Sequence, residues 1–255
     1  MRSIFLRLLS FFALGLMLLG FCSCSKGPSD NKPVSQVRKD PVVKPIPENP
    51  KPQKPEDFAE AIKIGQYEVK FSPLNQELAG FTTGTAFFKV TKTDFSVEVN
   101  IENSPVNTIH GQHIHMGNKC PGVEADVNAD GVIDFQEAAS AAGQIIIPLD
   151  GDIHSQLLDS YLFPVSDFSG MYNYIQSAPV HIMAEDLRLS DANIEDSMVK
   201  LGPEGKLNLE NKVVMIYGVA EETLLPLSTT TFGSFSAQAS LPIACGKITK
   251  ANGAF

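Results

Sequence analysis

"IHGQHIHMGNKC", residues 109–120, contains three of the chain's five histidines, His110, His113 and His115, and ends on Cys120. His113 and His115 are two residues apart, so on a β-strand their imidazoles point to the same face of the sheet. Imidazole nitrogen is a common ligand of copper, zinc and iron. The stretch therefore predicts a strand that presents a pair of candidate metal ligands. The alternative is that these histidines form hydrogen bonds within a sheet and hold no metal.

Short segments rich in β-forming residues surround this stretch. They are GTAFFKVTKT (84–93), DFSVEVNIEN (94–103), GQIIIPLDGD (143–152), NKVVMIYGVAEE (211–222) and LPIACGKITK (241–250). Two segments, 134–143 and 154–163, favour short helices, and the first of them ends on Gly143. Many short strands with few helices predict an all-β fold, a Greek-key β-barrel or sandwich, over residues 58–255.

Residues 1–24 have the anatomy of a secretory signal. A basic start with two arginines precedes an apolar run and two cysteines, Cys22 and Cys24. The apolar run is shorter than the roughly 20 residues that span a membrane. A signal that ends on cysteine resembles a bacterial lipoprotein signal, and Cys24, which follows a small serine, is the better candidate for acylation. We expect export and a lipid anchor in the bacterial cell envelope, in the periplasm or at the outer membrane; an ordinary signal peptide is the alternative.

Residues 25–57 are rich in proline and lysine, which is typical of an extended, semi-rigid linker. The chain carries a net charge of −9 at pH 7. Because many of its basic residues lie in the signal and the linker, the body is acidic. An acidic body argues against a nucleic-acid partner, which requires a basic surface. Two cysteines, Cys120 and Cys245, remain in the exported body, and an even pair in an oxidising compartment predicts one disulfide. The sequence identifies neither a protein partner nor an oligomeric state.

Three segments together resemble the copper/zinc superoxide dismutase family. They are the histidine stretch at 109–120, NIEDSMVKLGPEGKLNLENKVVMIYGVAEE (193–222) and PIACGKI (242–248), and the resemblance runs from about residue 66 to residue 248. It implies a Greek-key β-barrel of the superoxide dismutase type and a disulfide between Cys120 and Cys245. It also implies that His113 and His115 are copper ligands and that His110 has a structural role.

The sequence departs from the family at several functional positions. Tyr217 stands where the resemblance places a further copper-binding histidine, and Pro242 stands where it places the arginine that guides superoxide. No histidine occurs between His115 and His154, where the zinc ligands are expected. Two imidazoles form a weak clamp for copper, so we expect a degenerate copper site in which His113, His115 and Tyr217 are the possible ligands.

A second metal motif follows Cys120. "DVNADGVIDFQE", residues 126–137, fits the EF-hand calcium loop at each diagnostic position. Gly131 at position six permits the sharp turn, and Val132 at position seven supplies its carbonyl oxygen. The predicted calcium ligands are Asp126, Asn128, Asp130, Val132, Asp134 and Glu137. The alternative is a surface turn without an ion. Since no helix is expected before the loop, we interpret it as a structural calcium clip that lengthens this part of the β-domain, and not as a signalling switch.

Two classes of function follow from these features. The first is a lipid-anchored, calcium-binding module that keeps the fold of an enzyme and has lost its chemistry. The second is a copper-dependent superoxide dismutase or related oxidoreductase that uses His113 and His115. The missing histidines favour the first class.

Overall fold

The computed structural model describes residues 60–154, 162–188, 198–202 and 205–251. The predicted signal (1–24) and linker (25–57), with Cys24, lie outside these residues, as does most of the helix expected at 154–163. The lipid anchor therefore stays a prediction. No helix of the described residues combines the length and the apolar character needed to cross a membrane.

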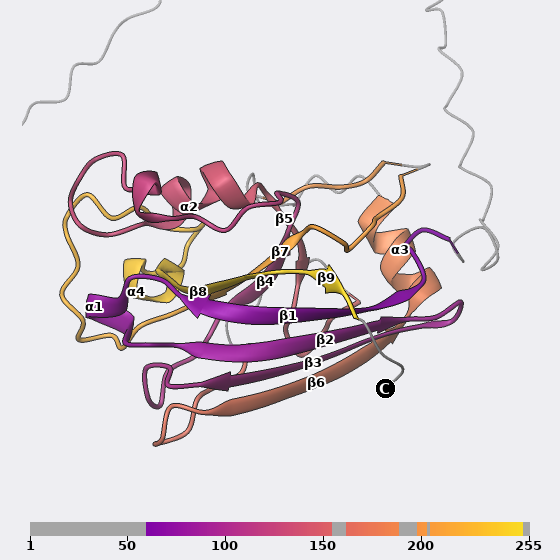
Figure 1. The fold of residues 1–255 in the computed structure, drawn as a ribbon, viewed down its shortest axis with the longest axis horizontal. Coiled ribbons are helices and arrows are strands. Elements are labelled where there is room, and N and C mark those ends of the chain that lie inside the picture. The colour runs from indigo at the N-terminus through magenta and orange to yellow at the C-terminus, as the bar shows by residue number, and fades with distance from the viewer. Residues whose placement is uncertain (1–59, 155–161, 189–197, 203–204, 252–255) are drawn as a thin grey trace, which may run out of the picture. The chain divides into compact units, whose positions relative to one another are not determined.

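The β-strands form one mostly antiparallel sheet that curls into a half-barrel (Figure 1). Their spatial order is β5-β4-β7-β8-β1-β2-β3-β6, with β9 paired to β1. The strands are β1 (Gly65–Pro73), β2 (Thr83–Val90), β3 (Asp94–Glu102), β4 (Gln112–His115), β5 (Ile145–Pro148), β6 (Tyr172–Pro179), β7 (Val213–Tyr217), β8 (Pro242–Lys247) and β9 (Thr249–Lys250). Connections from β3 to β4 and from β6 to β7 join strands that are not neighbours, as in Greek-key folds. The predicted all-β fold is confirmed.

Helices are few and short, which also agrees with the prediction. They are α1 (Gln76–Ala79), α2 (Phe135–Ala142), α3 (Val180–Arg188) and α4 (Ala237–Ser240), together with the 3-10 turn η2 (Val123–Ala125). The helix expected at 134–143 is α2, and it ends at Gly143, whose φ of 75° lies in the left-handed region that favours glycine. The sequence analysis did not predict β1, β6 or α3.

The sheet divides into two halves with different burial patterns. In the open half-sheet (β1, β2, β3 and β6), buried and solvent-facing residues largely alternate, as expected for a sheet with one wet face. In the covered half-sheet (β5, β4, β7 and β8), nearly every residue is buried. A strand that is buried on both faces needs a continuous apolar run, which explains the sequences IIIP in β5 and VVMIY in β7.

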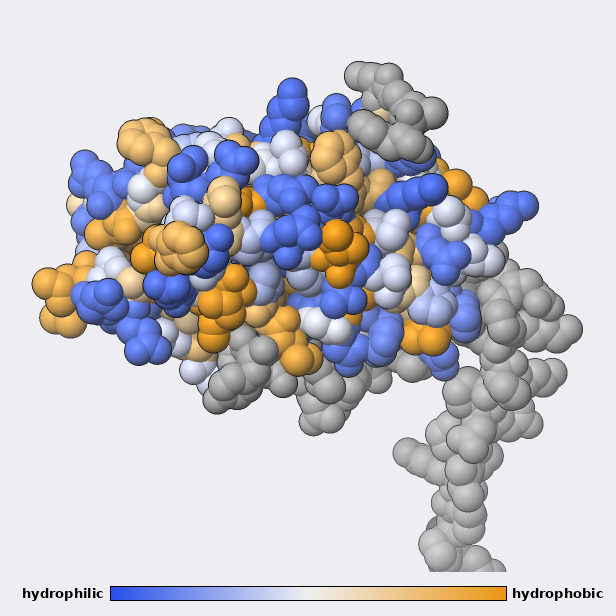
Figure 2. Space-filling view, turned by 90° about the horizontal axis from the view of Figure 1, so that it is seen from below, coloured by the Kyte–Doolittle hydropathy of each residue, from blue (hydrophilic) through white to orange (hydrophobic). Residues whose placement is uncertain are grey.

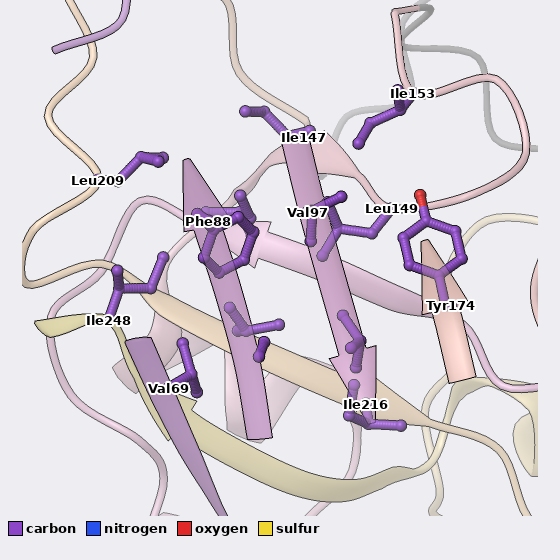
Figure 3. Close-up of a cluster of buried hydrophobic side chains, with 14 of the residues drawn as sticks. Val69, Phe88, Val97, Ile147, Leu149, Ile153, Tyr174, Leu209, Ile216 and Ile248 are labelled. Atoms are coloured by element: carbon purple, nitrogen blue, oxygen red, sulfur yellow. The ribbon is translucent and has the colours of Figure 1, made fainter. Parts of the chain in front are cut away.

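The main core fills the space between the two half-sheets. Figure 3 shows Val69, Phe88 and Val97 from the open half-sheet near Ile147 and Ile216 from the covered one. A second cluster of buried residues lies on the other face of the covered half-sheet, under α2, and it includes Phe135, Met215, Tyr217, Phe232 and Cys245. This second cluster buries the outer face of β4 and β7.

The opposite surface is mixed in character. Figure 2, seen from the side of β6, shows apolar residues scattered among polar ones over this face. Phe168 and Ile175 are exposed by 85% and 64%. Scattered apolar residues of this kind are normal on protein surfaces and need no functional explanation.

A disulfide and an asparagine fasten the acidic loop to the sheet. Cys120 and Cys245 are bonded, which confirms the predicted pairing, and they are separated by 125 residues in sequence. The side chain of Asn75 accepts a hydrogen bond from the backbone nitrogen of Ile133 and donates to the carbonyl oxygens of Ile133 and Pro242, each at 2.9 Å. The loop is therefore held from both the β1 and the β8 side.

Candidate metal-binding region

The central position of β4 fixes the direction of its two histidines. β4 pairs with β5 on one side and with β7 on the other. Ile114 points into the main core, so His113 and His115, its neighbours in sequence, point to the opposite face, under α2 and the residue 223–236 segment. The predicted arrangement of both imidazoles on one face is what the strand geometry requires. All three residues are buried.

Both ring nitrogens of His115 are already engaged. Its Nδ1 lies 2.7 Å from the carbonyl oxygen of Gly143, and its Nε2 lies 3.0 Å from the hydroxyl of Tyr217. Because a carbonyl oxygen only accepts, Nδ1 carries the proton and Nε2 accepts the hydrogen bond that Tyr217 donates. Burial lowers the pKa of His115 to about 4 and raises that of Tyr217, so both groups are neutral at pH 7.

His113 is the opposite case, since neither of its ring nitrogens has a hydrogen-bond partner. His113 as a whole is only 4% exposed. The rings of Phe163, Tyr217 and Phe232 surround it at centroid distances of 5.3, 5.3 and 6.0 Å. Burial, and next the neighbouring His115, lower the pKa of His113 well below its ordinary value. A buried polar group without a partner costs roughly 1–3 kcal/mol, so His113 is a group that a ligand would satisfy.

His110 lies between two backbone carbonyl oxygens and an aromatic ring. Its Nδ1 lies 2.9 Å from the carbonyl oxygen of Tyr217, and its Nε2 lies 3.2 Å from that of Pro105. Its ring also stacks on Tyr172 at 5.4 Å. His110 therefore braces the end of β7 and is not directed at the other two histidines.

The predicted copper trio lies together but is not arranged as a ligand set. The hydroxyl of Tyr217 is hydrogen-bonded to His115, and no hydrogen bond joins Tyr217 to His113. His154 is paired elsewhere, since its Nδ1 lies 2.8 Å from a carboxylate oxygen of Asp152. Among the described residues, no group of three or more His, Cys, Asp or Glu side chains is placed to hold a metal ion. Copper binding here therefore requires Tyr217 to release His115.

The acidic loop at 126–137 folds by hydrogen bonds from its backbone to its own side chains. Asp126 accepts from the backbone nitrogens of Asp130 (3.2 Å) and Gly131 (3.0 Å), and Asn128 accepts from Asp130 (2.9 Å). Asp130 in turn accepts from Val132 (2.9 Å). Gly131 has the positive φ of 87° that the tight turn requires. The side chains at positions one, three and five thus face the inside of the turn.

Glu137, at position twelve, reaches across the loop from the first turn of α2. Its carboxylate accepts from the backbone nitrogens of Val127 (3.0 Å), Asn128 (3.3 Å) and Asp134 (3.0 Å). Asp134 accepts in return from the nitrogen of Glu137, so the two residues form a capping box for α2. This helix cap accounts for both acidic residues without an ion. To close a calcium shell, Glu137 must exchange these backbone donors for the ion.

The oxygen chemistry of the loop suits a hard cation, and the loop is reachable from solvent. Asp126, Asp130 and Gly131 line a cleft of about 910 Å³, which gives an ion a route to the turn. A hydrogen bond from Ser228 lowers the pKa of Asp130, which keeps that carboxylate ionised. The donors therefore fit Ca²⁺ in kind and in spacing, while their present rotamers do not converge on one point.

The sequence analysis missed the segment that covers both candidate sites. Residues 223–236 reach the acidic loop through Ser228, which donates to Asp130, and through the backbone nitrogen of Thr230, which donates to Asp134 at 2.9 Å. The same segment places Phe232 against His113. The run LSTTTFGSFS (227–236), rich in hydroxyl side chains, was the available signal for a segment that caps acidic groups.

Comparisons with known proteins give a distant likeness of fold. No protein-family model matches the chain, and no curated protein matches it. Among solved structures, a double mutant of a SOD-like protein from Bacillus subtilis is similar, with a TM-score of 0.33 and 15% sequence identity, over 71% of this chain and 96% of that chain. A likeness of this degree bears on neither activity nor metal content.

Proposed function

We propose that this protein is a lipid-anchored module of the bacterial cell envelope whose β-domain binds calcium through residues 126–137 and carries a degenerate copper site. One observation supports the calcium site above the others. The side chains at positions one, three and five of the loop, Asp126, Asn128 and Asp130, all accept hydrogen bonds from the loop's own backbone. These hydrogen bonds hold the three side chains on the inner side of the turn, at the spacing of an EF-hand loop.

The degenerate copper site is the second part of the proposal. Copper redox chemistry requires several ligands that tolerate two oxidation states. Here Tyr217 replaces the expected imidazole and occupies Nε2 of His115. A binding or structural role at the envelope therefore fits the residues better than catalysis does.

Isothermal titration calorimetry of the full chain with CaCl₂ tests the calcium site. We expect one calcium ion per chain and a loss of affinity of at least about tenfold for Glu137→Gln, because position twelve supplies two oxygens. Glu124→Gln is the matched control: Glu124 is exposed, pairs with Lys119 and holds no position in the loop. No heat of calcium binding in the wild-type chain, or an equal loss in both variants, would refute the site.

The orphaned imidazole of His113 supports a second candidate function, copper binding in the manner of a superoxide dismutase or related oxidoreductase. A metal at His113 would satisfy a buried nitrogen that has no partner. Electron paramagnetic resonance of the full chain titrated with Cu²⁺ tests this function. Nitrogen hyperfine structure that disappears in His113→Leu and persists in His154→Leu would support it, and a dismutase assay would then follow. Spectra that are unaffected by His113→Leu would exclude it.

Membrane attachment through Cys24 is tested by fractionating cells that express the full chain. We expect the protein in the membrane fraction, with a mass increase that matches acylation of the new N-terminus. Cys24→Ala should move it to the soluble fraction or leave it unprocessed, whereas Cys22→Ala should change nothing. The opposite result would assign the anchor to Cys22, and no effect of either variant would indicate an ordinary signal peptide.

A further inference from the structure

The residue 223–236 segment is attached through its middle to the acidic loop. Ser228 donates to Oδ2 of Asp130, the nitrogen of Thr230 donates to Oδ2 of Asp134, and the backbone nitrogen of Gln136 donates to the hydroxyl of Thr230 at 3.1 Å. Among the described residues, these are the hydrogen bonds that tie the middle of the segment to the loop and to the start of α2. The position of the segment therefore depends on the position of the loop carboxylates.

The same segment also covers His113, through the ring of Phe232. The ring of Phe232 lies 4.8 Å from Phe135, 5.7 Å from Phe235 and 6.0 Å from His113, measured between centroids. Phe232 is 4% exposed, and its backbone nitrogen donates to the hydroxyl of Ser240 at 3.0 Å. Phe135, which follows Asp134 directly, contacts Phe232 and Tyr217, so the loop also supports two of the rings that surround His113. Displacing the segment would uncover the imidazole.

We infer that calcium at residues 126–137 controls access to the imidazole of His113, through the residue 223–236 segment. With calcium bound, the segment stays in place and Phe232 covers His113. Without calcium, the segment loosens and small reagents or ligands reach the ring. This inference rests on the proposed calcium site and adds a function to it.

The charge of the loop gives the direction of the effect. Asp126, Asp130, Asp134 and Glu137 place four carboxylates within twelve residues. Like charges at this spacing repel each other, and a divalent cation removes the repulsion. Calcium therefore favours the closed arrangement of the loop, and a loop without calcium favours an expanded one.

In Asp130 and Asp134 the two oxygens of each carboxylate have different partners, so calcium binding and attachment of the residue 223–236 segment can occur together. In Asp130, Oδ1 faces the turn and accepts from Val132, while Oδ2 accepts from Ser228. In Asp134, Oδ1 accepts from Glu137 and Oδ2 accepts from Thr230. Position five coordinates through one oxygen, and position nine commonly acts through water. Both residues can therefore serve the ion and hold the segment together.

Modification of histidines by diethyl pyrocarbonate, followed by tandem mass spectrometry, tests the inference on the full chain. The reagent attacks neutral imidazole that it can reach from solvent, so its rate at His113 reports how far the ring is covered. We expect His113 to react severalfold faster in EGTA than in excess calcium. His154, whose side chain is 49% exposed, provides the internal reference and should react at one rate in both.

The double variant Ser228→Ala/Thr230→Val tests the route, because it removes two hydroxyls that join the segment to the loop and leaves every predicted calcium ligand intact. We expect it to bind one calcium ion in calorimetry while His113 reacts at the EGTA rate in the presence of calcium. Thr231→Val is the matched control, since Thr231 is exposed on the same segment, and it should behave like the wild-type chain.

Each remaining outcome overturns a defined part of the inference. A chain that binds calcium in calorimetry but shows equal His113 rates with and without calcium would disprove the control of access and leave the calcium site standing. A double variant that stays protected in calcium would disprove the route through the hydroxyls of Ser228 and Thr230. A chain that gives no heat of calcium binding would remove both this inference and the proposed calcium site.

Discussion

The histidine pair on β4 and the acidic loop at 126–137 are two candidate metal sites whose polar side chains differ in how they find hydrogen-bond partners. The acidic loop satisfies its side chains locally, since the acceptors of Asp126, Asn128 and Asp130 all lie near backbone nitrogens of the same turn. Both histidines of the pair are buried, and of the two only His115 is satisfied, by the carbonyl oxygen of Gly143 and the hydroxyl of Tyr217. His113 is left without a partner.

This difference indicates how readily each region can bind an ion. The loop faces a solvent-open cleft, and to meet a cation its side chains must rotate and Glu137 must exchange its backbone donors for the ion. The histidine pair is closed by aromatic rings, and a metal must first break the hydrogen bond between His115 and Tyr217.

The largest effect should come from pH. Burial lowers the pKa of His115 from 6.5 to about 4 in the folded chain. Between these two values the unfolded chain takes up a proton that the folded chain refuses, so stability is full above pH 6.5 and falls as the pH drops toward 4. His115 alone should contribute a loss of about 3 kcal/mol over this window.

Urea denaturation of the wild-type chain and of His115→Gln at several pH values measures this contribution. The difference in pH dependence between the two proteins isolates His115 from the carboxylates, which titrate in the same range. Parallel curves for the two proteins would show that His115 is not a buried neutral histidine.

The next effect separates the two histidines by their opposite signs. His115→Leu should destabilise the chain by about 2 kcal/mol, because it leaves the hydroxyl of Tyr217 and the carbonyl oxygen of Gly143 without their partner. His113→Leu should stabilise the metal-free chain by about 1 kcal/mol, because it removes an unsatisfied buried group. Thermal unfolding in EDTA measures both. Equal destabilisation by both variants would mean that His113 has a partner after all.

A smaller effect concerns the anchor of the acidic loop. Asn75→Gly removes three hydrogen bonds and keeps the left-handed backbone, where Asn75 has a φ of 47°. We expect a loss of about 1.5 kcal/mol, together with weaker calcium binding. Asn107→Gly is the matched control, because Asn107 is exposed and has a φ of 51°. Equal losses in the two variants would show that the effect comes from the backbone and not from the hydrogen bonds.

The smallest effect is expected for Tyr217→Phe. This variant loses one hydrogen bond, at a cost of about 1 kcal/mol, and frees Nε2 of His115. A copper ion no longer has to displace the hydroxyl, so copper affinity should rise by roughly fivefold. Competition with a copper indicator dye measures the change. Weaker copper binding by the variant would show that Tyr217 is itself a ligand.

The sequence predicted those parts of the molecule whose signals are local. The strands of the covered half-sheet were predictable from apolar runs such as IIIP and VVMIY, and Gly143 marked the end of α2. The sequence analysis missed β6, an edge strand in which the apolar Ile175 faces outward and interrupts the apolar–polar alternation of the sequence. It also missed α3, which starts directly after Pro179, at the end of β6.

The hydrogen-bond partners of the histidines could not be predicted from the sequence, for a different reason. Tyr217 and His115 meet because β4 and β7 pair in one particular register, although 102 residues separate them in the chain. Likewise, the contacts of Ser228 and Thr230 with the acidic loop join residues that are 98 and 96 positions apart. Residue types and spacing identify candidate ligands, whereas the state of each ligand depends on such distant contacts.

The placement of β8 next to β1 has a consequence for the order in which the chain folds. Cys245 lies on this last long strand, and so does Pro242, whose carbonyl oxygen accepts from Asn75 across 167 residues. A nascent chain can form the turn at 126–137 and its hydrogen bonds to Asn75 early, but the disulfide and the contact with Pro242 must wait until β8 has been synthesised. Contacts of such long range slow folding. In time, the acidic loop is therefore among the last parts of the domain to become fixed, although its sequence motif is among the most compact.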